Sequence, residues 1–447
     1  MKTLLRFAFT LSFILNCPAL FAQHGGVMNH WHLGWFASME FTTGSPVATS
    51  GSAMICEEGS ATVSDELGNL LFYTNGGGSN NPWPGGVWNK NHQLMPNGNI
   101  TGLTGSDSSP QSSLIIKKSA TEYYLFTIGS AAAPAGVRVS IVDMSLDNGL
   151  GDLTLVGDPV LDSPSTPLAE GMTATEDASG TGHWLVVHSN SGNTFYVIHV
   201  TPTGISSPTT YNIGSGSSNN GQIKFSINGD RLAQGENIFD FDNATGVISN
   251  PIDLGSDGWG RAFSGSGRYF YMGQLGPVGD IHQYDLMATD VAASKVLVGS
   301  SGGTPLGPFQ IGPDFKIYFS IYSNNSLGAI ANPDLPGAAC GYDPQAVTLN
   351  ASSQLSIPNF IDSDLRFLSN TGELAKNESI LVAPNPTSDY LHLSNHVDSN
   401  EPYVILDLSG KQIDGWSHDD NRIDVRELHP GVYILQQGTA SARFVKK

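Results

Sequence analysis

Short apolar runs separated by tight turns fill most of the chain. Residues 223–233 and 261–271 each read as a short apolar strand, a turn of Asp, Asn or Gly, and a second strand rich in aromatic and aliphatic residues. Gly and Asn tolerate the positive φ angles of hairpin turns, so this pattern predicts β-hairpins. Further copies at 61–73 and 310–319 extend the pattern over residues 30–368.

The spacing of these hairpins favours a propeller. Phe225 and Phe263 occupy equivalent turns 38 residues apart, and Ile311 follows Phe263 after 48 residues. Repeats of about 40–50 residues with four strands each are typical of propeller blades, whereas solenoid repeats are shorter and more regular. Dividing the roughly 340 residues of the region by this period gives seven blades, with six or eight as alternatives.

The pattern changes after residue 377. Short strands flank Pro- or Gly-centred turns at 380–393, 403–411 and 431–446. About 70 residues with five to seven short strands predict a small sandwich. The chain is therefore expected to be all-β, with a β-propeller at 23–368, a linker at 369–377 and a small Ig-like β-sandwich at 378–447.

The N-terminus predicts export. Lys2 and Arg6 precede an apolar run at 7–15 that is too short to span a bilayer, and Ala22 offers a small residue for cleavage. Residues 1–22 are therefore expected to be a signal peptide. Later apolar stretches do not approach membrane length, so we expect a soluble mature protein without a transmembrane segment.

Composition and charge narrow the classes of binding partner that the protein could have. The chain carries 52 Gly, 25 Pro and a formal charge of −20. An acidic surface repels phosphate backbones and anionic lipids, which argues against nucleic-acid and peripheral membrane roles. It is compatible with neutral glycans, cationic ligands or divalent cations, and it equally serves to keep an extracellular protein soluble.

Two cysteines remain once a signal peptide containing Cys17 is removed. A propeller is a ring, so its first and last blades touch although they lie far apart in sequence, and residues 31–41 are the natural closing strand. Cys56 precedes the first blade and Cys340 lies in the tail of the last, so we expect a disulfide between them in an oxidising compartment. Two separately buried thiols are the alternative.

Parts of the body resemble a known propeller. The Phe-Ser turns are similar to WD-type repeats, and several strings resemble a propeller of Bacteroidetes surface proteins; these strings are 58–65, 68–74, 87–98, 327–340 and 356–360. The resemblance implies the fold and an extracellular setting. It implies no particular activity.

The C-terminal module resembles the type A sorting domain of type IX secretion cargo. Its three marks occur in order and end at the last residue; they are Pro384, Asn385 and Pro386, then 407–411, then Gly431, Val432 and Tyr433 with Lys446 and Lys447. The resemblance implies that the type IX secretion machinery is a partner and that the protein reaches the cell surface or the medium.

No catalytic signature is present. The sequence lacks a Gly-x-Ser-x-Gly elbow, a His-Glu-x-x-His helix and a phosphate-binding glycine loop, so no cofactor and no metal are expected. One constellation is of interest because several blades begin with a polar residue, which a propeller would bring to one ring at the mouth of its channel. The ring would comprise Glu58, Gln111, Glu170, Arg261 and Gln310. It would bind a polar ligand or a cation, or simply hydrate the axis.

Three weaker candidates have simpler alternatives. Trp83 is a candidate sugar platform, whereas Trp88 is expected to pack inside the first blade. Oxygens at 240–243 suit Ca²⁺ but equally suit a simple turn. His183 and His188 flank a strand without a second ligand at metal spacing.

We therefore expect a secreted or surface binding module for a glycan, a peptide or a surface protein. The alternative is a propeller-fold extracellular enzyme, such as a lactonase, a lyase or a glycosidase, with its site at the channel mouth. A structural role in a surface layer is the third possibility. Exposed aromatic rings on one rim would favour binding, whereas paired acids with a metal would favour an enzyme.

Overall fold

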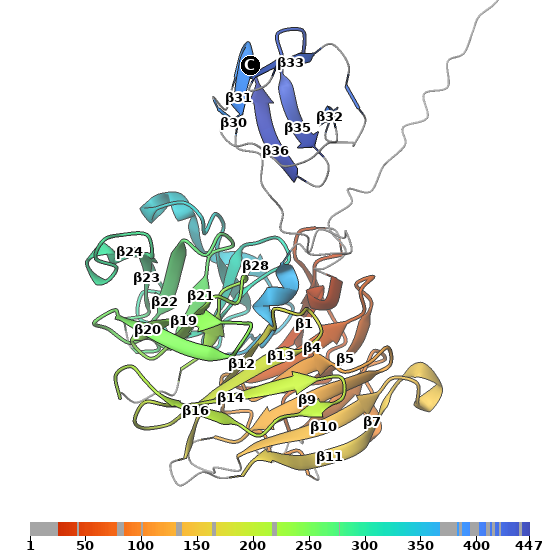
Figure 1. Ribbon diagram of the computed structural model, residues 1–447. Coiled ribbons are helices and arrows are strands. Elements are labelled where there is room, and N and C mark those ends of the chain that lie inside the picture. Colours follow the sequence, from red (N-terminus) through yellow and green to blue (C-terminus); the bar gives the residue numbers. More distant parts are fainter. Residues whose placement is uncertain are drawn as a thin grey trace, which may run out of the picture. The chain divides into compact units, whose positions relative to one another are not determined.

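The structure is a computed structural model of the whole chain (Figure 1). The residues that it describes are 26–42, 44–77, 85–99, 102–130, 136–162, 167–216, 221–276 and 278–366 in the large part, and 382–383, 387–393, 402–407, 412–413, 416–419, 422–437 and 440–447 near the C-terminus. The expected signal peptide and linker lie outside these residues. Contacts divide the chain into two units, residues 1–367 and 368–447.

The described residues of the large unit form seven sheets, whose consecutive strands pair in antiparallel hairpins. Six of the sheets repeat the hairpin pattern in chain order. They are β4–β7 (Gly59–Ser64, Leu70–Thr74, Gly86–Asn89, Leu94–Asn99), β8–β11 (Ser113–Lys117, Glu122–Ile128, Val137–Asp143, Asp152–Leu161), β12–β16 (Leu168–Glu176, His183–Ser189, Thr194–Thr201, Gly204–Ile205, Thr209–Asn212), β17–β20 (Lys224–Phe225, Arg231–Gln234, Asn237–Asp242, Val247–Asp253), β21–β24 (Gly260–Phe263, Tyr269–Gly273, Asp280–Asp285, Val296–Ser300) and β25–β28 (Leu306–Ile311, Ile317–Ile321, Ser326–Ile330, Tyr342–Thr348).

The seventh sheet and a short C-terminal strand close the ring. The sheet is β1–β3 (His30–Leu33, Ala37–Glu40, Val47–Thr49), and β29 (Ile357–Pro358) pairs in parallel with β4. The first strands β4, β8, β12, β17, β21 and β25 contact one another in turn, and β29 lies between β25 and β4. The large unit is therefore a seven-bladed β-propeller, as the repeat length predicts.

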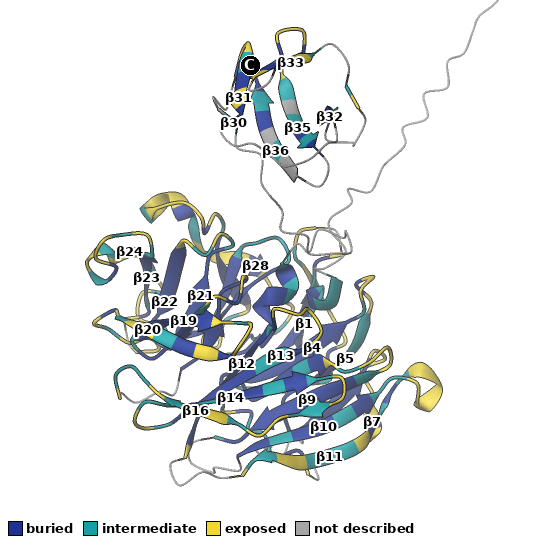
Figure 2. Cartoon of the chain, in the orientation of Figure 1, coloured by how far each residue is buried: buried dark blue, intermediate teal, exposed yellow. Residues whose placement is uncertain are grey.

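Burial follows the position of each strand in its blade. The innermost strands β4, β21 and β25 are buried at every residue, whereas the outermost strands β11 and β20 carry exposed residues (Figure 2). An inner strand is covered by a blade on each side, so both of its faces must be apolar or internally hydrogen-bonded. The innermost strands all begin at one end of the propeller, here called the N-face, and end at the other, the C-face.

The segment after β29 fills the centre of the ring. Asn359 donates through Nδ2 to the carbonyl oxygens of Ser113 and Met172, at 3.1 and 2.9 Å, and so joins the second and third blades. Asp362, in the 3₁₀ turn η5 (Asp362–Leu365), accepts from Lys224 Nζ at 3.1 Å. We call residues 359–366 the plug. Because the plug bonds to several inner strands, the channel is filled by protein along this segment.

The plug ends in charged contacts at the C-face. The backbone N of Glu176 donates to Ser363 Oγ at 2.9 Å, and Arg366 Nη1 lies 3.6 Å from Glu176 Oε2. Burial, together with the nearby Glu176 carboxylate, raises the pKa of Asp364 to about 7. The C-face end of the axis is therefore occupied by the protein's own ions.

The expected disulfide is not formed, and both thiols are free and buried. Cys56 packs beside Tyr73 and Trp88, and its Sγ donates to Gly59 O at 2.8 Å. Cys340 ends η4 (Gly337–Cys340), which contacts the outermost strand β24 of the neighbouring blade. The ring closes at the axis through β1 and β29, so ring closure does not bring the two cysteines together.

The described residues of the second unit form two small sheets around one apolar cluster. One sheet orders its strands β30 (Val382–Ala383), β31 (Tyr390–Leu393), β34 (Arg422–Asp424) and β33 (Ser417–Asp419); the other contains β32 (Tyr403–Asp407), β35 (Gly431–Gln437) and β36 (Ala440–Lys446). Leu391 and Ile423 from the first sheet pack with Ile405, Leu435 and Phe444 from the second. This arrangement is the predicted β-sandwich.

Candidate functional site

Carboxylates gather on the N-face where the first three inner strands begin. Glu58 precedes β4, and its backbone N donates to Asp107 O at 2.9 Å, which joins the loops leading into β4 and β8. Glu170 lies near the start of β12, close enough for its charge to act on Glu58. Glu57 completes the group beside Glu58. Burial, together with the charge of Glu57, raises the pKa of the Asp107 carboxyl. The N-face thus carries acids from three successive blades.

The environment alters the protonation of Glu58. Burial, reinforced by repulsion from Glu170 and Asp107, raises the pKa of its carboxyl to about 8. The folded protein therefore holds this proton at neutral pH, where the unfolded chain would release it, and the associated stabilisation falls as the pH rises towards 8. A protonated carboxyl is able to donate a hydrogen bond as well as to accept one.

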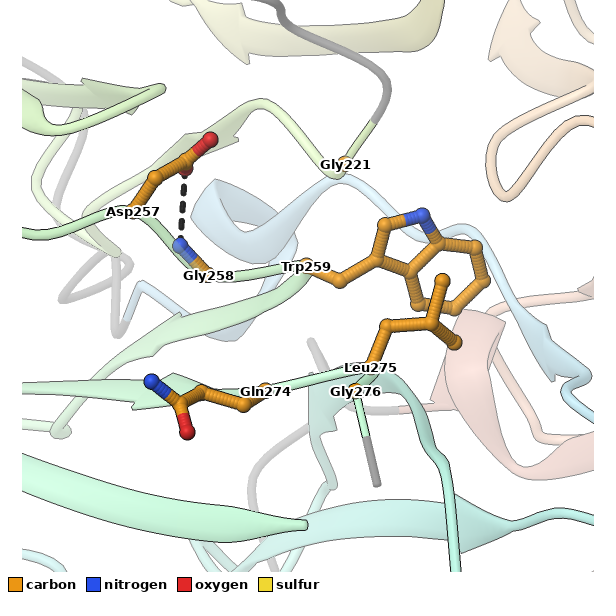
Figure 3. Close-up of a pocket in the computed structure, with 7 residues that line it drawn as sticks. All are labelled: Gly221, Asp257, Gly258, Trp259, Gln274, Leu275 and Gly276. Atoms are coloured by element: carbon orange, nitrogen blue, oxygen red, sulfur yellow. Dashed lines mark hydrogen bonds between the residues drawn. The ribbon is translucent and has the colours of Figure 1, made fainter. Parts of the chain in front are cut away.

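A pocket of about 450 Å³ opens on the same face, between the loops that lead into β17 and β21. Its polar lining comes from Asp257 and Gln274, and its apolar lining from Trp259 and Leu275. In Figure 3 the Trp259 and Leu275 side chains point to one side, and those of Asp257 and Gln274 point to the other. Apolar walls with a few placed polar groups are typical of small-ligand sites.

Close backbone packing shapes this pocket and connects it to the acids. A Cβ atom added at Gly221 would lie 2.7 Å from Arg261 Nη1 and 2.8 Å from Trp259 O, so the pocket wall requires glycine there. Gly171, which follows Glu170, is also closely packed, with its Cβ position 3.0 Å from Gly221 O. The carboxylates and the pocket are therefore neighbouring parts of one face.

Three of the predicted ring residues are fully buried and bonded to neighbours. Gln111 spans blades, with Nε2 donating to Ile223 O and Asn359 Oδ1, both at 3.0 Å. Arg261 Nη2 donates to Gly235 O at 3.0 Å and to Asp257 Oδ1 at 2.5 Å. Gln310 bonds to the plug, where its Nε2 donates to Asp362 Oδ1 at 2.7 Å. Of the five predicted ring residues, only Glu58 and Glu170 are brought together with their carboxyls on the N-face.

Three exposed aromatic residues on the N-face were missed by the sequence reading. Trp35 and Phe36 form the turn between β1 and β2, and Tyr322 follows β26, with its N donating to Pro305 O before β25. Among the described residues of the propeller, these three are the Trp, Phe and Tyr side chains that are exposed. A Trp-Phe pair in a short turn is the signal that would have found two of them.

The weaker candidates have structural partners. Trp88 is buried and stacks on Tyr73 with ring centroids 5.7 Å apart, which confirms its expected packing; Trp83 lies outside the described residues. Asp240 pairs with Arg231, and Asp242 Oδ2 accepts from Thr245 Oγ1 at 2.6 Å within its turn. In the described part of the chain, no group of three or more His, Cys, Asp and Glu side chains is placed to hold a metal ion.

Of the two histidines, His188 is buried and His183 is partly exposed. Burial lowers the pKa of His183 to about 4 and that of His188 to about 4. The Nδ1 of His188 lies 2.6 Å from Ser189 O. Both rings belong to strand β13 and are neutral at physiological pH.

The end of the chain is fixed inside the second unit. Thr387 N donates to Val445 O and Lys447 N donates to Thr387 O, both at 2.8 Å. Tyr433 stacks on Phe444 with ring centroids 5.7 Å apart, and its hydroxyl donates to His429 O at 2.9 Å. Pro384, Asn385 and Pro386 lie outside the described residues. The two parts of the third predicted motif thus meet on paired strands, because Gly431 of β35 pairs with Lys446 of β36.

A comparison with protein families decides the role of this unit. Residues 381–447 match the secretion system C-terminal sorting domain. The unit is a type IX sorting domain. The chain is therefore a cargo that interacts with the type IX secretion machinery and is exported to the cell surface or extracellular space. Among the described residues, no helix is both long and apolar enough to cross a membrane.

Comparisons of the whole chain give the following. A candidate 6-phosphogluconolactonase of Bacteroides fragilis is 11% identical, with a TM-score of 0.48, over 73% of this chain and 96% of its own. A second from Bacteroides uniformis is 12% identical, with a TM-score of 0.46, over 74% of this chain and 96% of its own. No curated protein matches the chain.

Proposed function

We propose that this exported propeller is a binding module whose ligand site is the N-face. The ligand is cationic or hydroxyl-rich, and it is bound outside the cell by the carboxyls of Glu58 and Glu170 and by the adjacent pocket. On this view the first 22 residues serve as the signal peptide, and the sorting domain delivers the propeller to its place of action.

The distribution of open and filled ends supports this proposal most directly. The plug occupies the centre of the ring and ends in the charged contacts of Arg366 with Glu176 at the C-face. On the N-face, by contrast, the half-buried carboxyls of Glu58 and Glu170 adjoin a pocket. Convergent polar groups beside an apolar pocket are the usual setting of a ligand site.

Hydrolysis at the same place is the second candidate. A carboxyl with a raised pKa beside an ionised one is the arrangement that supplies a general acid and a base. Glu58, with a pKa of about 8, and Glu170 are such a pair. An enzyme of this kind would release product from the ligand that it binds, and Glu58→Gln would abolish release while preserving binding.

The test is a glycan array probed with the purified chain and with two variants. Glu170→Gln removes one charge from the N-face at nearly constant volume, so binding of the retained ligand is expected to fall about tenfold, the value of one charge-assisted hydrogen bond. Thermal stability should be nearly unchanged. Glu66→Gln is the matched control, because Glu66 lies in the turn at the far end of β4 and pairs with Lys117 in solvent. Equal binding by the wild type and both variants would contradict the proposal.

A further inference from the structure

The pocket between the loops that lead into β17 and β21, here called the Trp259 pocket, is lined by polar atoms that lack partners. Asp257 accepts from Gly258 N and from Arg261 Nη2, at 2.7 and 2.5 Å, through its Oδ1 atom alone. Among the described residues, no group bonds to Asp257 Oδ2, to the carboxamide of Gln274 or to the indole Nε1 of Trp259. Folded proteins pair most of their enclosed polar groups, so these atoms are available to a ligand.

The charge of the Trp259 pocket is balanced inside the protein. Of the described residues that line it, only Asp257 is charged, and its side chain is 42% exposed. The side chain of Arg261 is 1% exposed, and its two Nη atoms also donate to the carbonyl oxygens of Gln222 and Gly235. This fixed cation offsets the field of the carboxylate. A ligand therefore meets a strong hydrogen-bond acceptor, whereas an ammonium or a carboxylate group gains little from the pair.

The two sides of the Trp259 pocket require a two-sided ligand. Trp259 and Leu275 supply the apolar side, and Asp257 and Gln274 supply the polar side (Figure 3). A wholly apolar ligand would leave the polar groups dry and unpaired, at a cost of about 1–3 kcal/mol for each. A carboxylate oxygen accepts, and a carboxamide both donates and accepts. The arrangement therefore suits a ring with an apolar face and neighbouring hydroxyl groups.

The adjacent carboxyl also favours an uncharged ligand. Gly171, with its Cβ position 3.0 Å from Gly221 O, joins the pocket wall to the start of β12, where Glu170 lies beside Glu58. Burial raises the pKa of Glu58 to about 8, so at neutral pH this carboxyl carries a proton in place of a charge. It is thus able to donate a hydrogen bond to a hydroxyl or ether oxygen.

We propose that the Trp259 pocket holds one pyranose ring of a neutral glycan. The apolar face of the ring lies against Trp259 and Leu275, and two neighbouring hydroxyls bond to Asp257 Oδ2 and to the Gln274 carboxamide. This inference rests on the proposed binding function and names its ligand class and the place of one sugar. A sugar is favoured over a peptide because one rigid ring carries both the apolar face and the hydroxyls, so little conformational entropy is lost on binding.

The probes are hexasaccharides that differ in charge or in stereochemistry. The β-1,4-linked hexamers of glucose, glucosamine and glucuronic acid share a backbone and are neutral, cationic and anionic; the α-1,4-glucose and β-1,4-mannose hexamers are further neutral probes. Each is titrated against the full chain at pH 6. At least one neutral hexamer is expected to bind, about tenfold or more tightly than either charged hexamer. Its affinity should stay nearly constant as sodium chloride is raised, because no ion pair with the ligand is screened.

Gln274→Ala is the decisive variant. It removes a carboxamide that has no partner among the described residues, so affinity for the retained neutral hexamer should fall about tenfold while the thermal midpoint stays nearly unchanged. Gln345→Ala, at an exposed residue of the outermost strand β28, is the matched control and should leave affinity unchanged. Asp257 is kept in these variants because its loss would leave the buried charge of Arg261 uncompensated.

A second variant tests the apolar side of the pocket. Leu275→Ala shortens a side chain that is partly in solvent, so it should lower the affinity severalfold with little loss of stability. Leu297→Ala, at a more exposed leucine on the outermost strand β24, is its control and should bind the neutral hexamer as the wild type does.

Three results would overturn the inference. The first is a charged hexamer that binds as tightly as the best neutral one, and the second is the failure of all the neutral hexamers to bind. The third is wild-type affinity in Gln274→Ala, which would place the ligand outside the Trp259 pocket. The proposed binding function survives all three as long as Glu170→Gln still weakens binding of the glycan retained on the array. An unaffected Glu170→Gln variant would contradict that function and remove the basis of this inference.

Discussion

Deletion of residues 378–447 is expected to leave folded propeller trapped in the periplasm of a host with type IX secretion. The matched sorting domain spans 381–447 and has its own apolar cluster, which includes Leu391, Ile405 and Phe444. The blades of the propeller are built without these residues, so their removal should abolish outer-membrane passage without unfolding the propeller.

Cell fractionation with immunoblotting, together with protease resistance of the trapped propeller, measures this effect. The control is the reverse experiment, in which residues 378–447 are fused to an unrelated periplasmic reporter and should carry it out of the cell. The account of export fails if the truncated chain reaches the surface at the normal level. It fails equally if the fused reporter stays in the periplasm.

The second large effect is expected at the plug. In Asp362→Ala the buried ammonium of Lys224, whose side chain has an exposed fraction of 0%, would keep Gln310 Oε1 but lose its carboxylate. Removing one partner of a buried ion pair typically costs about 3–5 kcal/mol, because the other charge is left uncompensated. Gln310 Nε2 would also lose its bond to Asp362 Oδ1. The free energy of unfolding of the propeller should fall by an amount in this range.

Urea unfolding of the full chain, followed by tryptophan fluorescence, gives this difference. The double variant Lys224→Met with Asp362→Leu should recover most of the loss, since the charge is removed together with its partner. Glu66→Ala breaks an exposed pair with Lys117 and should cost less than about 1 kcal/mol. A loss in Asp362→Ala no larger than that of Glu66→Ala would show that the plug does not hold the ring.

The hairpin pattern sufficed to predict the blades but not the part that β29 plays in their closure. Turns such as those after Phe225 and Phe263 are local, so composition reveals them. The strand β29 is only Ile357–Pro358, and its parallel pairing with β4 has no local signature. The expected closing segment 31–41 does take part in the closure, because it forms most of the sheet β1–β3, with Trp31 fully buried against Phe41 and Tyr318.

The site was predicted only in part, because the repeats show where strands begin but not which distant segments come into contact. Glu58 and Glu170 lie at the beginnings of inner strands, which the repeat locates, and the structure brings their charges together. Gln310 lies deeper in its strand, where it contacts a plug that only the folded ring creates. Sequence separation hides such contacts: Gln310 and Asp362 are 52 residues apart, and Gln111 and Asn359 are 248 apart.

Hydrogen–deuterium exchange of the full chain, with and without the glycan that it retains most strongly on the array, tests the central claim most directly. Amide exchange reports local opening, which a bound ligand suppresses near its site. The account predicts slower exchange in N-face segments, namely 34–36, 57–58, 107–111, 257–261 and 274–276, and unchanged exchange in the C-face turns at 65–69 and 227–230. Protection confined to the C-face turns or to the sorting domain would contradict it.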